Sequence, residues 1–172
     1  MGKPTVLIVE DDAGIAALVR NAVAGCDCNP VTVDTGGEAI EWLLENDADL
    51  LLIDNVLPDM YALDLLDRIE DVGRQFPFIV TTGNSSESVA VELMKRGAVD
   101  YVIKDTEFLD RLPVAINRAL QMLSARERLS EVENALHQYR VETEAILEAA
   151  ADGITTFDNT GKIITANGAL CE

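Results

Sequence analysis

Between Thr5 and Asp110, short apolar segments alternate five times with segments that have apolar residues at helical spacing. This alternation constrains the fold more than any other feature of the sequence, because strands alternating with helices form a parallel sheet with helices on both faces. The apolar segments are rich in β-branched residues and are bounded by turn residues, as buried strands are. Strands are expected at 5–9, 31–33, 48–54, 77–82 and 99–103, and helices at 13–24, 36–46, 63–72 and 86–97, with a further helix opening near Asp110.

Composition excludes several classes of protein. Hydrophobic residues make up 48% of the chain, which indicates a globular core rather than disorder. The net charge of −18 argues against nucleic-acid binding by this segment, because phosphate contacts require a basic patch. The three cysteines lack zinc-site spacing and their odd number argues against a disulfide framework. No apolar run has the length of a membrane span or the flanks of a signal peptide, so a cytoplasmic protein without membrane contact is expected.

The last predicted helix is unusually long, because no glycine or proline follows Pro113 until Gly153. Pro113 itself is expected in the first turn, where proline is tolerated. Apolar positions then recur in alternating steps of three and four, which is a heptad pattern: Met122, Ala125, Leu129, Val132, Leu136, Tyr139, Thr143, Ile146 and Ala150. This stripe predicts a homodimer through the C-terminal helix, with a dimer seam at Leu129, Val132, Leu136, Tyr139 and Ile146. The alternative is that the helix folds back on its own domain.

Residues 153–166 predict two short strands around an Asp-Asn-Thr-Gly turn. A lone hairpin is marginally stable in water. The chain is therefore expected to stop inside a second domain.

Polar residues follow the predicted strands where each one ends. Glu10 and Asp11 follow the first strand, Asp54 ends the third, Thr82 ends the fourth, and Lys104 follows the fifth. In a parallel sheet these positions share one edge, and that edge is where ligands bind. Carboxylates brought together there repel one another unless a cation lies among them, and oxygen ligands suit Mg²⁺ or Mn²⁺.

A carboxylate beside such an ion can act as a nucleophile toward phosphorus. The transferring phosphoryl group also needs a cationic side chain and a hydroxyl or backbone donor, which Lys104 and Thr82 can supply. Asp54 is therefore the candidate acceptor, and the carbonyl of Val56 is a further candidate metal ligand.

Ordinary structural roles are the alternative for each of these residues. Glu10, Asp11 and Asp12 could cap the first helix, and Asp12 is expected to do so. Thr82 could be a simple β-former and Lys104 a solvated cation. The agreement of four strand ends favours the phosphoryl chemistry. A nucleotide-binding enzyme is disfavoured, because EDDAGI follows the first strand in place of a glycine-rich loop.

Four segments, LIVEDD, LLIDNVLPDM, FIVTTG and GAVDYVIKD, resemble the receiver domain of two-component response regulators, over residues 4–121. The resemblance implies a doubly wound, flavodoxin-like sheet. It also implies transfer of a phosphoryl group, with Mg²⁺ or Mn²⁺, from the phosphohistidine of a histidine kinase or histidine phosphotransfer protein. The roles that it implies are phosphoacceptor for Asp54, metal ligands for Glu10, Asp11, Asp54 and Val56, and phosphoryl-binding or switch residues for Thr82, Lys104 and Tyr101.

The sequence departs from the family at two positions. Asp105 stands where the family usually has a proline after the lysine, so a trans peptide bond and a differently shaped loop are expected there. Ala62 stands where a glycine is usual, and a left-handed backbone would be strained for alanine. These departures are the basis of the alternative function, a receiver-like interaction scaffold that does not switch.

The stretch ILEAAADGITTFDNTGKIITANGALCE resembles the start of a PAS sensor domain. The expected organisation is a receiver domain at 4–121, a coiled-coil signalling helix at 122–150 and a PAS-like fragment at 151–172. Receiver, helix and PAS in this order imply a larger protein, either a sensor histidine kinase or a response regulator.

Overall fold

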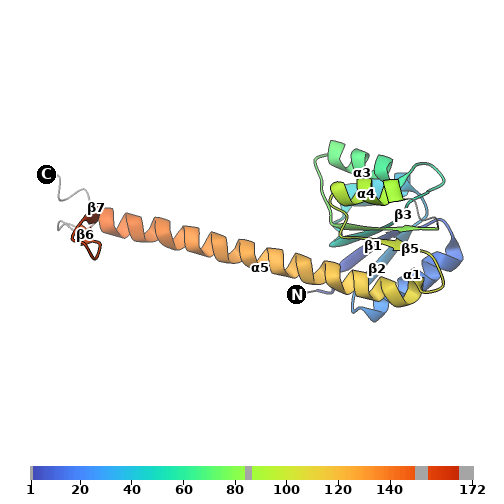
Figure 1. Cartoon of the computed structure of the whole chain (residues 1–172). Coiled ribbons are helices and arrows are strands. Elements are labelled where there is room, and N and C mark those ends of the chain that lie inside the picture. The colour runs from blue at the N-terminus through green and yellow to red at the C-terminus, as the bar shows by residue number, and fades with distance from the viewer. Residues whose placement is uncertain (1, 84–86, 150–154, 167–172) are drawn as a thin grey trace. The chain divides into compact units, whose positions relative to one another are not determined.

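The computed structural model describes residues 2–83, 87–149 and 155–166. The chain divides into two compact units, Met1–Leu123 and Ser124–Glu172. The first unit contains a five-stranded parallel sheet, as predicted (Figure 1), and its strand order is β2-β1-β3-β4-β5. Its strands are β1 (Thr5–Val9), β2 (Asn29–Val33), β3 (Leu50–Asp54), β4 (Phe78–Thr82) and β5 (Asp100–Ile103). The helices are α1 (Ala13–Gly25), α2 (Gly36–Glu45), α3 (Ala62–Asp71), α4 (Glu87–Lys95) and α5 (Phe108–Ala149).

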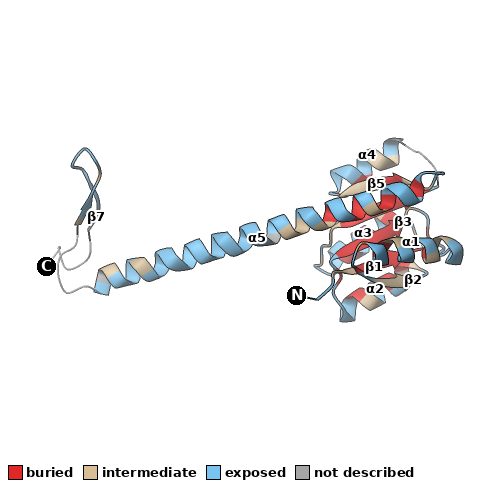
Figure 2. Cartoon of the chain, turned by 90° about the horizontal axis from the view of Figure 1, so that it is seen from below, coloured by how far each residue is buried: buried red, intermediate tan, exposed pale blue. Residues whose placement is uncertain are grey.

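Two hydrophobic cores lie on opposite faces of the sheet, because successive residues of a strand point to opposite sides. Val6 and Ile8 of β1 face the core that α1 and α5 cover. Leu7 and Val9 face the core that α2, α3 and α4 cover. Figure 2 shows these buried positions in the strands and on the inner sides of the helices. Burial on both faces explains why the strands are continuous apolar runs.

The chain winds in opposite directions on the two sides of β1, which pairs with β2 on one side and β3 on the other. A doubly wound sheet opens a crevice at such a point, beyond the carboxyl ends of the strands. The residues that follow β1 and β3 therefore lie at the position where this architecture binds ligands.

The N-terminus of α1 is capped as expected. The Asp12 side chain accepts hydrogen bonds from the amides of Gly14 and Ile15, at 2.8 and 2.9 Å. The Asp12 side chain thus caps the helix, whereas Glu10 and Asp11 lie at the crevice.

The prediction for Pro113 was wrong. Helix α5 begins at Phe108, so Pro113 lies in its second turn. The earlier start has two causes: the buried side chain of Phe108 anchors the helix to the core, and the Asp105 carboxylate accepts the Glu107 amide just before it. Proline removes the hydrogen bond to the carbonyl of Leu109, which lies in an exposed turn where water can replace it.

Ala62 does not have the left-handed backbone that would strain it. Among the described residues other than glycine, only Asp27 has a positive φ. Ala62 is the first residue of α3 and is fully buried. Its methyl group therefore contributes to the core beneath the loop that follows β3.

The second unit contains the part of α5 from Ser124 onward and an antiparallel pair of strands, β6 (Thr155–Phe157) and β7 (Ile163–Ala166). The strands lie where the hairpin was predicted. Residues 150–154 and 167–172 of the PAS-like stretch, and Ala150 of the heptad pattern, lie outside the described residues. Among the helices described, none has both the length and the apolar character that a membrane span requires.

Candidate functional site

Three carboxylates meet in the crevice at the ends of β1 and β3. Glu10 and Asp11 follow β1, and Asp54 is the last residue of β3. Their nearest oxygen atoms all lie within 4.8 Å of one another. Glu10 is buried, Asp54 is half-buried and Asp11 is exposed, so the cluster opens to solvent at Asp11. The structure thus brings together three of the residues predicted to bind a metal ion.

Lys104 reaches this cluster from beyond β5. Its Nζ donates to Glu10 Oε2 at 2.6 Å and to Asp54 Oδ2 at 2.7 Å. The Lys104 side chain is only 10% exposed, so water screens these charges weakly. Its backbone amide donates to the carbonyl of Thr82 at 2.7 Å, which extends the pairing of β4 and β5 to the edge of the sheet where the carboxylates lie.

Glu10 has an unsatisfied oxygen. Burial raises the pKa of Glu10 above its usual value, although the hydrogen bond and charge of Lys104 act in the opposite direction. Glu10 Oε1 is buried and has no hydrogen-bond partner among the described residues. A buried acceptor without a partner is costly. An all-oxygen group of this kind, with one oxygen unsatisfied, fits a hard divalent cation such as Mg²⁺.

Thr82 and Tyr101 lie on β4 and β5, the two strands that follow β3 in the sheet. Thr82, the last residue of β4, is 3% exposed and pairs in register with Ile103. Tyr101 pairs with Val80, two positions earlier, and packs half-buried against the core under α2, α3 and α4. The structure therefore places Thr82 at the edge of the site and Tyr101 one strand further away.

The loop after β3 is held by backbone hydrogen bonds. The Asn55 amide donates to Thr81 O at 2.8 Å, Leu57 to Met60 O at 3.0 Å, and Ala62 to Asn55 O at 3.1 Å. None of these three bonds uses the carbonyl of Val56, whose side chain is exposed. That carbonyl is carried by a well-supported turn immediately after the phosphoacceptor candidate.

Asp59 ties this loop to α2, a contact that was not predicted from the sequence. Its carboxylate accepts the amides of Gly36 and Gly37, at 3.0 and 2.9 Å. An acidic side chain at a helix N-terminus is favourable because it satisfies unpaired amides and interacts with the helix dipole. The signal in the sequence was the Gly-Gly pair, which lets the loop approach the helix closely.

Gly36→Ala is expected to destabilise the protein by about 1–3 kcal/mol, because overpacking displaces neighbouring side chains. A Cβ at Gly36 would lie 2.5 Å from the sulfur of Met60, in the loop after β3. Gly37→Ala is the matched control, since its Cβ would make ordinary contacts with Asp59 at 3.4 Å and Thr35 at 3.9 Å, and alanine favours the helix. Chemical denaturation measures both changes. Equal stability of the two variants would contradict the proposed packing of Met60 over Gly36.

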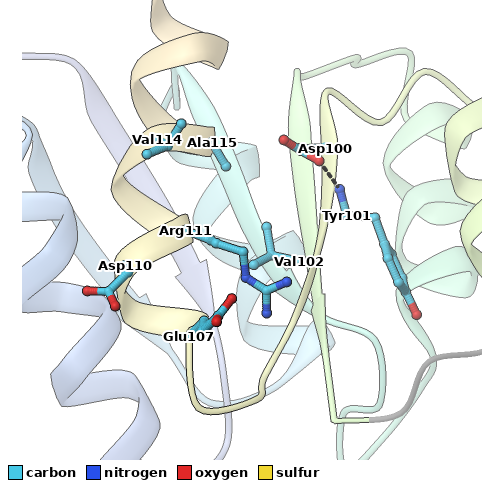
Figure 3. Close-up of a pocket in the computed structure, with 8 residues that line it drawn as sticks. All are labelled: Asp100, Tyr101, Val102, Glu107, Asp110, Arg111, Val114 and Ala115. Carbon is cyan, nitrogen blue, oxygen red and sulfur yellow. Dashed lines mark hydrogen bonds between the residues drawn. The ribbon is translucent and has the colours of Figure 1, made fainter.

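A hollow of about 370 Å³ lies between β5 and the start of α5. Figure 3 shows the Arg111 side chain extending across it from α5 toward β5, and the Asp100 carboxylate accepting the Tyr101 amide at 2.8 Å. The lining residues are Asp100, Tyr101, Val102, Glu107, Asp110, Arg111, Val114 and Ala115.

Comparison with known proteins identifies the family to which this chain is related. The family model described as the response regulator receiver domain matches residues 6–117. The regulatory protein LuxO of Vibrio cholerae is 33% identical over 171 residues, which cover 92% of this chain and 37% of LuxO. The transcriptional regulatory protein ZraR of Klebsiella oxytoca is 32% identical over 126 residues, covering 73% of this chain and 27% of ZraR. The chain thus spans well under half the length of these relatives.

Solved structures with the same fold include the signal receiver domain of a LuxO repressor protein from Vibrio parahaemolyticus. It has a TM-score of 0.68 and 30% identity, and the match covers 74% of this chain and 97% of that one. The receiver domain of a Francisella response regulator has a TM-score of 0.63 and 25% identity, and covers 70% of this chain and 98% of its own.

Proposed function

Because this chain belongs to the family of response regulator receiver domains, we propose that Asp54 is the residue that accepts the phosphoryl group in two-component signalling. One observation carries this assignment. The Asp54 carboxylate stands at the end of β3 with two further carboxylates within 4.8 Å and with Lys104 Nζ at 2.7 Å. Glu10 has the same kinds of neighbours, with Lys104 Nζ at 2.6 Å, but its side chain is only 3% exposed against 13% for Asp54, so Asp54 is the more accessible of the two to a phosphodonor.

Glu10, Asp11 and Asp54, together with the carbonyl of Val56, would hold Mg²⁺ or Mn²⁺. When bound, the ion neutralises charge that develops on the oxygens of the transferring phosphoryl group. The unsatisfied Oε1 of Glu10 supports this role, because it is a buried acceptor beside the other ligands.

In the transfer step, an Asp54 carboxylate oxygen forms a bond to phosphorus while the bond from phosphorus to the donor's imidazole nitrogen breaks. The imidazole leaves with the electron pair of that bond. The Lys104 ammonium and the Thr82 hydroxyl would donate to the phosphoryl oxygens. Movement of Thr82 toward the phosphoryl group would then change the packing of Tyr101 and of the face formed by α4, β5 and α5.

The phosphodonor would be a histidine kinase or a histidine phosphotransfer protein. For the chain as a whole, residues 4–121 would form the receiver, 122–150 a signalling helix and 151–172 the start of a PAS domain. The antiparallel pair β6 and β7 supports the last assignment, since a PAS domain begins with such strands. The longer protein would be a sensor histidine kinase or a response regulator, and the names of the LuxO and ZraR relatives support the second.

The test of the function is uptake of one phosphoryl group from acetyl phosphate, measured as the mass of the intact protein. Uptake should require Mg²⁺ or Mn²⁺ and should stop when EDTA removes the metal. A mass that stays unchanged at saturating Mg²⁺, together with no binding of beryllofluoride, would contradict the proposal.

We also propose that α5 pairs with a second copy of the chain. The seam residues Leu129, Val132, Leu136, Tyr139 and Ile146 are all more than half exposed in the single chain, and Figure 2 shows that almost all of α5 beyond Leu123 is exposed. A helix with such a stripe has no core of its own. In a parallel, in-register pair, Arg128 at one edge of the seam would lie beside Glu133 of the other helix, which is an attractive contact.

Leu136→Asp should convert the dimer to a monomer, because a carboxylate in the seam would be buried against an apolar partner. The expected loss of dimer affinity is at least about 100-fold. Asn134→Asp is the matched control, since it adds the same charge on the opposite side of the helix. Light scattering after size-exclusion chromatography reports the mass of each variant. A wild-type chain that is monomeric at high concentration would exclude the pairing.

A further inference from the structure

Arg111, at the end of the first turn of α5, contacts the chain on both sides of Lys104. Its Nη2 donates to the carbonyl of Ile103 at 3.1 Å and also to the carboxylate of Asp105. Figure 3 shows this side chain extending from α5 toward β5. The backbone before and after Lys104 is thus held by one guanidinium group.

Asp105 is held by two further contacts. The same carboxylate oxygen that binds Arg111 accepts the amide of Glu107 at 2.9 Å, and the carbonyl of Asp105 accepts the amide of Phe108 at 3.1 Å. The Glu107 amide, and after it the Arg111 guanidinium, hold the pKa of Asp105 below its usual value. The carboxylate is therefore charged and available for the ion pair.

These contacts stand where the family usually has a proline. All peptide bonds among the described residues are trans, so the bond between Lys104 and Asp105 is trans, as expected from the sequence. A proline restricts the backbone through its ring. Here an aspartate has no such ring, and the restriction comes from the ion pair with α5.

The position of the Lys104 backbone matters for its ammonium group. Nζ is carried on a flexible four-carbon stem, yet it must reach both Glu10 Oε2, at 2.6 Å, and Asp54 Oδ2, at 2.7 Å. A shift of the backbone at Lys104 would be transmitted to both contacts. Reaction rates depend steeply on how precisely a catalytic group is placed relative to the reacting atoms.

We propose that Arg111, through Asp105 and the carbonyl of Ile103, is a positioning residue that places Lys104 for phosphoryl transfer to Asp54. The inference rests on the proposed function of Asp54. It adds that a residue of α5 is needed for phosphoryl transfer at the full rate. Side chains of this pair are close to half exposed, at 43% for Arg111 and 46% for Asp105. A pair that exposed contributes little to folding stability, so its loss should appear in the rate rather than in the unfolding midpoint.

The experiment compares the rates of phosphoryl uptake from acetyl phosphate at saturating Mg²⁺. Arg111→Ala should slow uptake about 10-fold, with Mg²⁺ affinity unchanged because the metal ligands lie on β1, β3 and the loop after β3. Arg111→Lys should recover part of the rate, since an ammonium group can still pair with Asp105. Arg118→Ala is the matched control: Arg118 is exposed, lies about two turns further along α5, and its loss should leave the rate unchanged.

A double variant tests whether Arg111 acts through Asp105. Asp105→Ala should also slow uptake, and the double variant should be slowed by less than the product of the two single effects, because both substitutions remove the Arg111–Asp105 contact and only Arg111→Ala removes the contact to the Ile103 carbonyl. Losses that multiply, or an Arg111→Ala variant at the wild-type rate, would overturn the positioning role while leaving phosphorylation intact. A wild-type protein that takes up no phosphoryl group would instead overturn the function of Asp54.

Discussion

Asp54→Asn is expected to stop Mg²⁺-dependent phosphoryl uptake, with a rate at least about 1,000-fold below that of the wild type. The substitution keeps the shape of the side chain but replaces the nucleophilic carboxylate with an amide. It also removes one of the three carboxylates that lie within 4.8 Å of one another, so binding of the metal ion weakens at the same time. Intact-protein mass after treatment with acetyl phosphate measures the uptake.

Asp71→Asn is the control for this result. Asp71 is an exposed carboxylate at the end of α3, and its loss should not change uptake. The assignment of Asp54 would be wrong if the Asp54→Asn variant still acquired one phosphoryl group at the wild-type rate. In that case Asp11, the exposed carboxylate of the cluster, would become the candidate acceptor.

Lys104→Met should have the second-largest effect, with opposite consequences for transfer and for metal binding. Transfer should slow by about 100-fold, which is typical of the loss of one donor to a developing charge. Mg²⁺ should bind at least as tightly as in the wild type, because the substitution removes a positive charge that lies 2.6 Å from Glu10 and 2.7 Å from Asp54. Rates of uptake and isothermal titration with Mg²⁺ separate the two effects.

Lys95→Met is the matched control, since Lys95 is exposed in the last turn of α4 and lies outside the site. Circular dichroism in the presence of Mg²⁺ shows whether the Lys104→Met variant is folded, which matters because Glu10 is only 3% exposed and loses its cation. Loss of Mg²⁺ binding by a folded Lys104→Met variant would contradict the proposed roles, as would transfer at the wild-type rate.

Much of the site was predictable because its residues have fixed places in a repeating architecture. The apolar runs located the ends of the strands, and parallel strands bring those ends to one edge. Glu10, Asp54 and Lys104 could be expected along one edge of the sheet for that reason alone. The cap formed by Asp12 was equally predictable, since it depends on residues two and three positions away.

The contacts that were not predicted join segments that are far apart in the sequence or have no repeating pattern. Asp59 reaches the N-terminus of α2 across 22 and 23 residues. Helix α5 begins at Phe108, before the start predicted near Asp110, because a buried Phe108 and the Asp105 turn outweigh the usual preference for proline in the first turn. Such outcomes depend on packing, which local propensity does not describe.

The order of strands and helices, the chemical types at the strand ends and the heptad stripe of α5 were determined by the sequence alone, because periodicity and residue type carry that information directly. Only the tertiary structure decided that Lys104 joins Glu10 and Asp54, that Glu10 Oε1 is left unsatisfied, and that Arg111 holds the loop around Lys104. Those features are set by side-chain directions and burial, and both are defined only once the sheet and its helices have packed.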